Sequence, residues 1–114
     1  MSVRYHISLP VPAQARGKDP AFSFTANGAD AFAEQLQDAL RNDTLFLRWR
    51  DAQAEPDEVD PVLGATDPAA QVTGQQRDLR IDLVATTSLN GDVFKHRLRL
   101  LAGHGWELRD VTPA

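Results

Sequence analysis

Five arginines recur in segments whose apolar residues stand at every second position. These arginines stand between the apolar residues, and one histidine and one phenylalanine stand at equivalent positions. The full set is Arg4, His6, Phe46, Arg48, Arg50, Arg80 and Arg109. Because successive side chains of a strand point to opposite faces, apolar neighbours such as Ile7 and Ile81 would line a core, and this set would face away from it. A guanidinium donates two parallel hydrogen bonds to a carboxylate or phosphate. The pattern therefore predicts a basic sheet face suited to an anionic partner.

The same face has other interpretations. Asp82 and Glu107 fall in the same phase, so the arginines could instead form cross-strand ion pairs on a solvated surface. A dimer interface, a site for an anionic small molecule and a site for single-stranded nucleic acid are the functional alternatives. Nucleic acid is the least favoured, because base stacking needs aromatic residues on central strands and residues 78–86 contain none.

No arrangement of residues typical of catalysis is found. His6, His96 and His104 form no HxH or HxxxH pair and cysteine is absent, so no cluster of metal ligands is expected. There is no Gly-x-Ser-x-Gly sequence and no glycine-rich phosphate loop; Ser88, ahead of Asn90, is the nearest candidate nucleophile. We expect no enzymatic activity, no metal and no cofactor.

Two strand–helix–strand units would position these side chains. Alternation of apolar residues predicts strands, and apolar stripes at helical spacing predict helices between them; the strands are at residues 3–9, 45–49, 79–86 and 106–111, and the helices at residues 28–41 and 91–102. A further short strand is predicted at residues 22–24. The repeated unit predicts an α+β fold, a ferredoxin-like two-layer sandwich. A helix-packed meander with another strand order is the competing arrangement.

Particular residues mark the ends of the two helices. Asn27 and Asn90 are the predicted N-caps, and Gly103 is the predicted left-handed C-cap. Trp106 follows this glycine turn and is expected inside the core.

An acidic segment at residues 51–77 separates the two units. It holds six of the sixteen acids and one of the twelve bases, a net charge of −5 in a chain of net charge −4. Pro56, Pro61 and Pro68 interrupt any helix there. The segment is predicted to be a mobile acidic linker within a single domain of residues 1–114. Its charge suggests loose shielding of the basic sheet face; an inert tether is the alternative.

The outer faces of the two predicted helices carry opposite charges. Asp30, Glu34 and Asp38 lie on the first helix, whereas the second carries Lys95, Arg97 and Arg99. Surface ion pairs between neighbouring helices are one interpretation. A basic docking face on the second helix is the other.

Residues 98–111 contain the local motif Gly103-His104-Gly105-Trp106-Glu107-Leu108. This segment resembles the end of small uncharacterised bacterial domains, in which a helix passes through a Gly-x-x-Gly-Trp-Glu-Leu turn into a final strand. Ala102 stands where the first glycine of that motif falls. The resemblance implies a helix–turn–strand ending and no particular activity.

The chain of 114 residues has the length of one domain. No apolar run approaches the roughly 18 residues of a membrane span, and the first residues do not form a signal peptide, so a cytoplasmic location is expected. The expected function is a protein-interaction or accessory module without catalysis, acting on a protein partner or on a second copy as a homodimer. The alternative is a binding domain for an anionic small molecule on the arginine-rich face.

Overall fold

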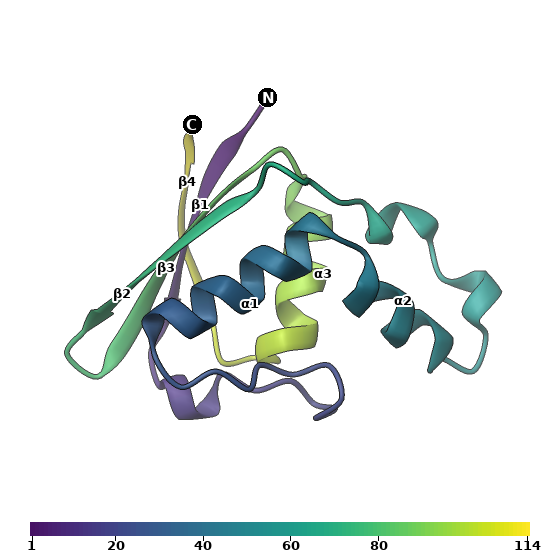
Figure 1. Cartoon of the computed structure of the whole chain (residues 1–114), viewed down its shortest axis with the longest axis horizontal. Coiled ribbons are helices and arrows are strands. Elements are labelled where there is room, and N and C mark those ends of the chain that lie inside the picture. Colours follow the sequence, from purple (N-terminus) through teal and green to yellow (C-terminus); the bar gives the residue numbers. More distant parts are fainter.

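A four-stranded antiparallel sheet and three helices make up the computed structural model, which describes all 114 residues (Figure 1). The strands are β1 (Val3–Leu9), β2 (Gln71–Arg77), β3 (Arg80–Thr87) and β4 (Glu107–Pro113), in the sheet order β2-β3-β1-β4. The helices are α1 (Ala29–Arg41), α2 (Thr44–Asp51) and α3 (Gly91–Ala102). The predicted α+β class is confirmed.

The core lies between one face of the sheet and the helices α1 and α3. Tyr5, Ile7 and the alternate residues of β3 point into it, as the strand period predicts. The apolar stripes of the two helices, which include Phe32 and Leu98, meet these residues and are fully buried. The Tyr5 and Phe94 rings stack with their centroids 4.1 Å apart. The opposite face of the sheet has no helix on it.

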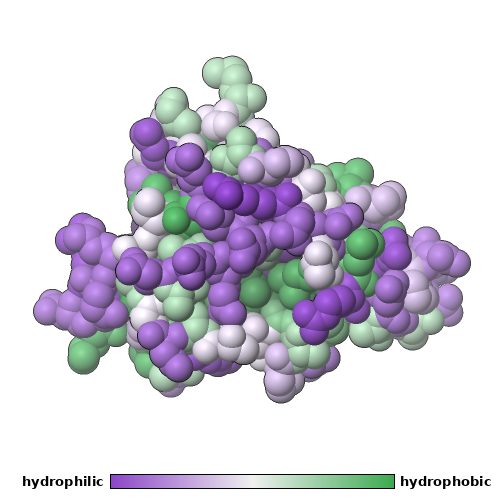
Figure 2. All heavy atoms as spheres, viewed as in Figure 1, coloured by the Kyte–Doolittle hydropathy of each residue, from purple (hydrophilic) through white to green (hydrophobic).

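The solvent-facing side of the helical layer is polar. Hydrophilic residues cover most of the face on which α1 lies, and hydrophobic residues reach the surface in small separate groups (Figure 2). Asp30, Glu34 and Asp38 are exposed there, as expected. No ion pair joins α1 to α3, because the four ion pairs of the protein lie within α2 or on the sheet. No helix combines the length and apolar character needed to cross a membrane.

The start of α3 agrees with the prediction, and the start of α1 does not. The Asn90 side chain accepts a hydrogen bond from the Val93 N–H at 3.0 Å. Gly103 ends α3 with the positive φ of 60° that favours glycine, but its ψ of −117° lies outside the predicted left-handed helical region. Gly28, rather than Asn27, precedes α1. The amide oxygen of Gln35 instead accepts from backbone N–H groups of the preceding loop, so a residue inside the helix fixes its entry.

The predicted strand at residues 22–24 is wrong. Phe22 and Phe24 are buried, but this segment does not pair with β1. The Phe24 N–H donates to the Leu101 carbonyl at 2.8 Å, and the Ser23 hydroxyl donates to the same carbonyl at 3.3 Å. The loop therefore satisfies a carbonyl that the last turn of α3 would leave without a partner.

The predicted strand at residues 45–49 is a helix, α2. The short alternating pattern of residues 45–49 is also compatible with a helix, because Phe46 and Trp49 stand three residues apart and so lie on one helical face. In the structure this face is directed toward the protein. Their ring centroids lie 5.8 Å apart, and the His96 ring of α3 packs edge-on against Trp49 at 4.5 Å. Three rings therefore attach α2 to α3.

The predicted linker of residues 51–77 is correspondingly shorter. Gln71–Arg77 forms the edge strand β2, so this part of the prediction is wrong. Two 3-10 turns, Pro56–Glu58 and Pro61–Gly64, lie in the remainder. The second turn packs against α2 and α3, and Figure 1 shows this stretch beyond α2, away from the sheet. The acidic segment thus lies with the helices and does not shield the open sheet face.

Arg97 holds this segment in place from the protein interior. It was expected at the edge of the outer face of its helix, but it is fully buried. Its guanidinium donates to the Ala39 carbonyl at the end of α1 and to the carbonyls of Leu63 and Ala65, at 3.0 and 2.8 Å. Burial lowers the pKa of Arg97, and Asp43 opposes this effect. The acidic segment is therefore attached through backbone oxygens.

Asp67 fixes the point where the chain turns into β2. Its buried carboxylate accepts from the Thr87 hydroxyl at 2.8 Å and from the backbone N–H groups of Ser88 and Ala69. These hydrogen bonds, led by that from Ser88, hold the pKa of Asp67 below its usual value despite burial. The carboxylate joins the end of β3 to the start of β2.

The segment with the local motif forms a helix, a turn and a strand. Gly103 and Gly105 pack against the backbone of residues 14–16, where a Cβ at either glycine would lie within 2.6 Å of a carbonyl oxygen. Trp106 was expected inside the core; it lies at the core's margin, half-buried, with its ring N–H donating to the Gly103 carbonyl.

We expect Arg97→Met to destabilise the protein, because the carbonyl of buried Ala39 and those of the more exposed Leu63 and Ala65 would all lose their donor. The expected loss in the free energy of unfolding is about 2–4 kcal/mol, measured by urea denaturation, with faster proteolysis within residues 52–66. Arg99→Met on the exposed side of α3 is the control and should change little. Equal stability of the Arg97 variant and the native protein would contradict the anchoring role.

Stability should also fall as the pH drops below about 6.5, because of His96. Its Nδ1 is buried without a hydrogen bond, and burial, with Arg97 and Arg99 nearby, lowers its pKa from 6.5. Below this pH the unfolded chain binds a proton at His96 that the folded protein binds less readily. Neutral His96 therefore contributes to the free energy of unfolding above pH 6.5, and this contribution is lost as the pH falls. Urea denaturation between pH 5 and 7 measures this. His96→Phe should flatten the dependence.

Candidate binding site on the open sheet face

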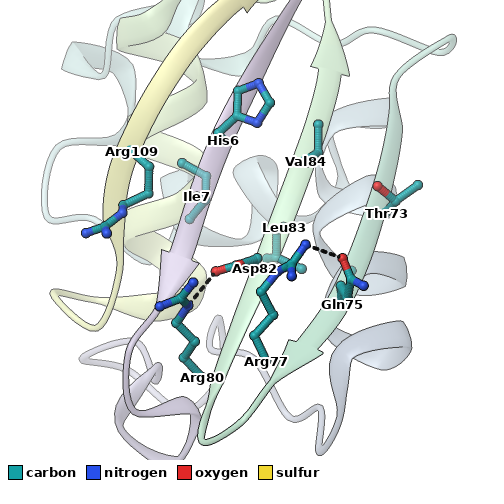
Figure 3. Close-up of a pocket in the computed structure, with 11 residues that line it drawn as sticks. His6, Ile7, Thr73, Gln75, Arg77, Arg80, Asp82, Leu83, Val84 and Arg109 are labelled. Carbon is teal, nitrogen blue, oxygen red and sulfur yellow. Dashed lines mark hydrogen bonds and ion pairs between the residues drawn. The ribbon is translucent and has the colours of Figure 1, made fainter.

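The face of the sheet opposite the helices contains a hollow of about 550 Å³. All four strands contribute to it, and its polar lining comes from His6 of β1, Thr73, Gln75 and Arg77 of β2, Arg80 and Asp82 of β3, and Arg109 of β4 (Figure 3). The strand register places Gln75 opposite Asp82 and Arg77 opposite Arg80. The hollow therefore follows from residues that share one face by the strand period.

Asp82 organises the positive side chains at one end of the hollow. The Arg77 Nε lies 2.9 Å from one of its oxygens and the Arg80 Nε lies 3.2 Å from the other. Arg77 also donates from Nη2 to the Gln75 side chain at 2.8 Å. Because each guanidinium has five N–H donors, both retain donors that are free to bind a further anion.

Arg109 lies on the same face, at a β-bulge in β4. The register between β1 and β4 shifts between His6 and Ile7, so β4 carries an extra residue at this point. The Arg109 guanidinium lies 2.8 Å from the Glu107 carboxylate, and both side chains are more than half exposed. Across the hollow, His6 Nε2 is 2.9 Å from the Thr112 hydroxyl. This hydrogen bond orients the imidazole.

The hollow has a positive charge in a negatively charged protein. Three arginines and one carboxylate line it, whereas the chain as a whole has a net charge of −4. Ion pairs at this exposure contribute little to stability, under about 1 kcal/mol each. The arginines are therefore not required to hold the sheet together and are free to serve binding.

The structure brings together four of the seven residues predicted for this face. His6, Arg80 and Arg109 line the hollow, and Arg4 lies on the same face, one alternate position before His6 on β1.

The placement of Phe46, Arg48 and Arg50 on the sheet is wrong, because all three belong to α2. Phe46 is buried under the acidic segment, with its ring against Gly64. Arg48 donates to the Ala21 carbonyl and Arg50 pairs with Asp51, so neither reaches the hollow.

Arg77, with Thr73 and Gln75 of the same strand, lines the hollow but was not predicted for this face. Residues 71–77 contain glutamines and a glycine with only Val72 buried, so they show almost no apolar alternation. The sequence signal for this strand was a possible two-residue hairpin turn, Asp78–Leu79, ahead of β3. In the structure Asp78 has a positive φ of 54°. Aspartate tolerates that conformation in tight hairpins.

Comparison of the chain with protein-family models, with curated proteins and with solved structures gives no match. No three histidine, cysteine or acidic side chains are grouped closely enough to hold a metal ion.

Replacing the one carboxylate that lines the hollow should strengthen anion binding there. Asp82→Asn leaves the charges of Arg77 and Arg80 uncompensated, so we expect the dissociation constant for inorganic phosphate, followed through backbone amide shifts of β2 and β3, to fall several-fold. The free energy of unfolding should change by less than about 1 kcal/mol. Asp30→Asn makes the same charge change on α1 and should leave phosphate binding unchanged. Equal effects of the two variants would mean that only the net charge of the protein matters.

Proposed function

We propose that the protein is a non-catalytic binding module that holds an acidic segment of a partner protein on its open sheet face. The observation that supports this most is that Arg77, Arg80 and Arg109 all line one uncovered hollow. A planar guanidinium matches a carboxylate with two parallel hydrogen bonds. A shallow face shared by four strands also suits an extended peptide better than a deeply enclosed ligand.

The topology is consistent with a ferredoxin-like sandwich, which we propose as the fold. The chain runs strand–helix–strand twice, with α2 and the acidic segment inserted before β2, and the sheet order β2-β3-β1-β4 keeps β1 and β3 in the centre. In this arrangement both helices lie on one face. The uncovered face then offers side chains of all four strands to a partner.

An anionic small molecule is the second candidate. The volume of about 550 Å³ falls in the range of small-molecule sites. However, few apolar side chains line the hollow, and such sites are mostly apolar, with few polar groups. We therefore place the acidic peptide first.

A titration can separate the two candidates. A glutamate-rich peptide added to isotopically labelled protein should produce saturable amide shifts in β2, β3 and β4, weakened by added salt. Arg77→Gln with Arg80→Gln should abolish them. The matched control is Lys18→Gln with Arg99→Gln, which removes two positive charges from exposed positions outside the hollow.

The small-molecule arm uses citrate and inorganic phosphate at the same ionic strength. Tighter binding of either than of the peptide, lost in the same arginine variant, would favour the second candidate. Shifts that do not depend on Arg77 and Arg80, or no saturable shifts with any probe, would overturn the proposal.

A further inference from the structure

The edge strand β2 has backbone groups without partners along the middle of its outer side. In an antiparallel pair, alternate residues of a strand direct their N–H and C=O groups toward the neighbour, and the residues between direct theirs away. Val72 belongs to the second set, because its N–H bonds the Gln37 side chain of α1 at 3.0 Å instead of β3. By alternation, Gly74 and Gln76 also direct their backbone groups outward.

Side chains of α1 form hydrogen bonds with backbone groups only at the N-terminal end of this edge. Arg41 donates to the Ala70 carbonyl at 2.6 Å, and Gln37 accepts from Val72. The carbonyl of Val72 and both backbone groups of Gly74 and of Gln76 have no such partner. Val72 to Gln76 therefore forms an open stretch centred on Gly74.

The opposite edge of the sheet is protected by devices that β2 lacks. Strand β4 contains a bulge, the charged residues Glu107, Arg109 and Asp110, and Pro113 near its end. Asp110 also accepts from the Val111 N–H at 2.9 Å. Bulges, charges and proline are the usual protection of an edge against pairing. From Gln71 to Gln76, β2 has no charge, proline or bulge.

We propose that β2 pairs with the β2 strand of a second copy, antiparallel about a two-fold axis at Gly74, to give a continuous eight-stranded sheet. In this register each Gly74 N–H donates to the Gly74 carbonyl of the other copy. Each Gln76 N–H donates to the Val72 carbonyl opposite. The pairing uses the free groups, and each Val72 N–H exchanges the Gln37 oxygen for the Gln76 carbonyl opposite, so the edge is complementary to itself.

The side chains favour the same register. Thr73 lies opposite Gln75 of the second copy, and Gln71 lies opposite Arg77, so no like charges meet. Arg41, held at the Ala70 carbonyl, lies beside Asp78 of the second copy. Because Thr73, Gln75 and Arg77 all line the hollow, the dimer places two positive hollows side by side. This extends the proposed function, since one acidic chain can then span both.

Charge variants at the open-face positions of β2 test the register. Thr73 and Gln75 are exposed, so substituting them does not disturb the core, whereas Gly74 must be kept because a Cβ there would lie 2.4 Å from the Ala29 carbonyl. The native protein should show a monomer–dimer equilibrium by sedimentation, from about 10 µM to about 1 mM, as befits a one-strand interface. Thr73→Lys with Gln75→Lys should be monomeric throughout, and so should Thr73→Glu with Gln75→Glu.

An equal mixture of the lysine and glutamate variants should restore the dimer, because opposite charges then face each other. Val111→Lys on the β4 edge is the control and should dimerise like the native protein. Hydrogen exchange gives an independent measure: the Gly74 and Gln76 amides should gain protection with concentration, whereas Val72 should be protected at all concentrations. A native protein that stays monomeric at about 1 mM, or a mixture that fails to associate, would overturn the proposal. These measurements use no anion, so they stand apart from the test of the proposed function.

Discussion

A buried guanidinium with no carboxylate partner is the interaction on which the arrangement of the helical layer depends. Arg97 occupies the interior of α3 and bonds only backbone carbonyls, at the end of α1 and on either side of Gly64. The carbonyl end of a helix carries partial negative charge, which suits a cation. Residues 56–65 contribute no buried side chain of their own, so the segment is held by this charge and by the Phe46 ring that packs against Gly64.

The route of the acidic segment decides what the sheet exposes. Held beside α2 and α3, the segment returns to the sheet only at Asp67, whose carboxylate joins the ends of β2 and β3. Its acids stay with the helical layer, and the arginines of β2, β3 and β4 keep an uncovered face. The molecule is therefore electrically asymmetric, which favours oriented approach of a charged partner from the sheet side.

The candidate site could be predicted in part. Alternation is enough to place His6, Arg80 and Arg109 on one face, because the apolar residues beside them can only point into the core. Arg77 was not predicted because the inner face of its strand carries only one buried apolar side chain, Val72, besides a glycine. Phe46 and its neighbours were misplaced because eight residues with mixed apolar spacing fit a strand and a helix equally well. Burial of Phe46 against Gly64, a contact distant in sequence, settles that ambiguity.

Local sequence patterns are enough to define the elements whose periodic pattern is long or whose ends carry specific capping residues. These are β1, β3, the apolar stripes of α1 and α3, and the caps at Asn90 and Gly103. Only the tertiary structure shows that residues 71–77 form the remaining strand of the sheet, β2, and that Arg97 lies in the interior. The physical reason is that an edge strand needs hydrogen bonds from a neighbour more than apolar side chains of its own, and a buried charge needs carbonyls from distant segments. Neither requirement leaves a local pattern.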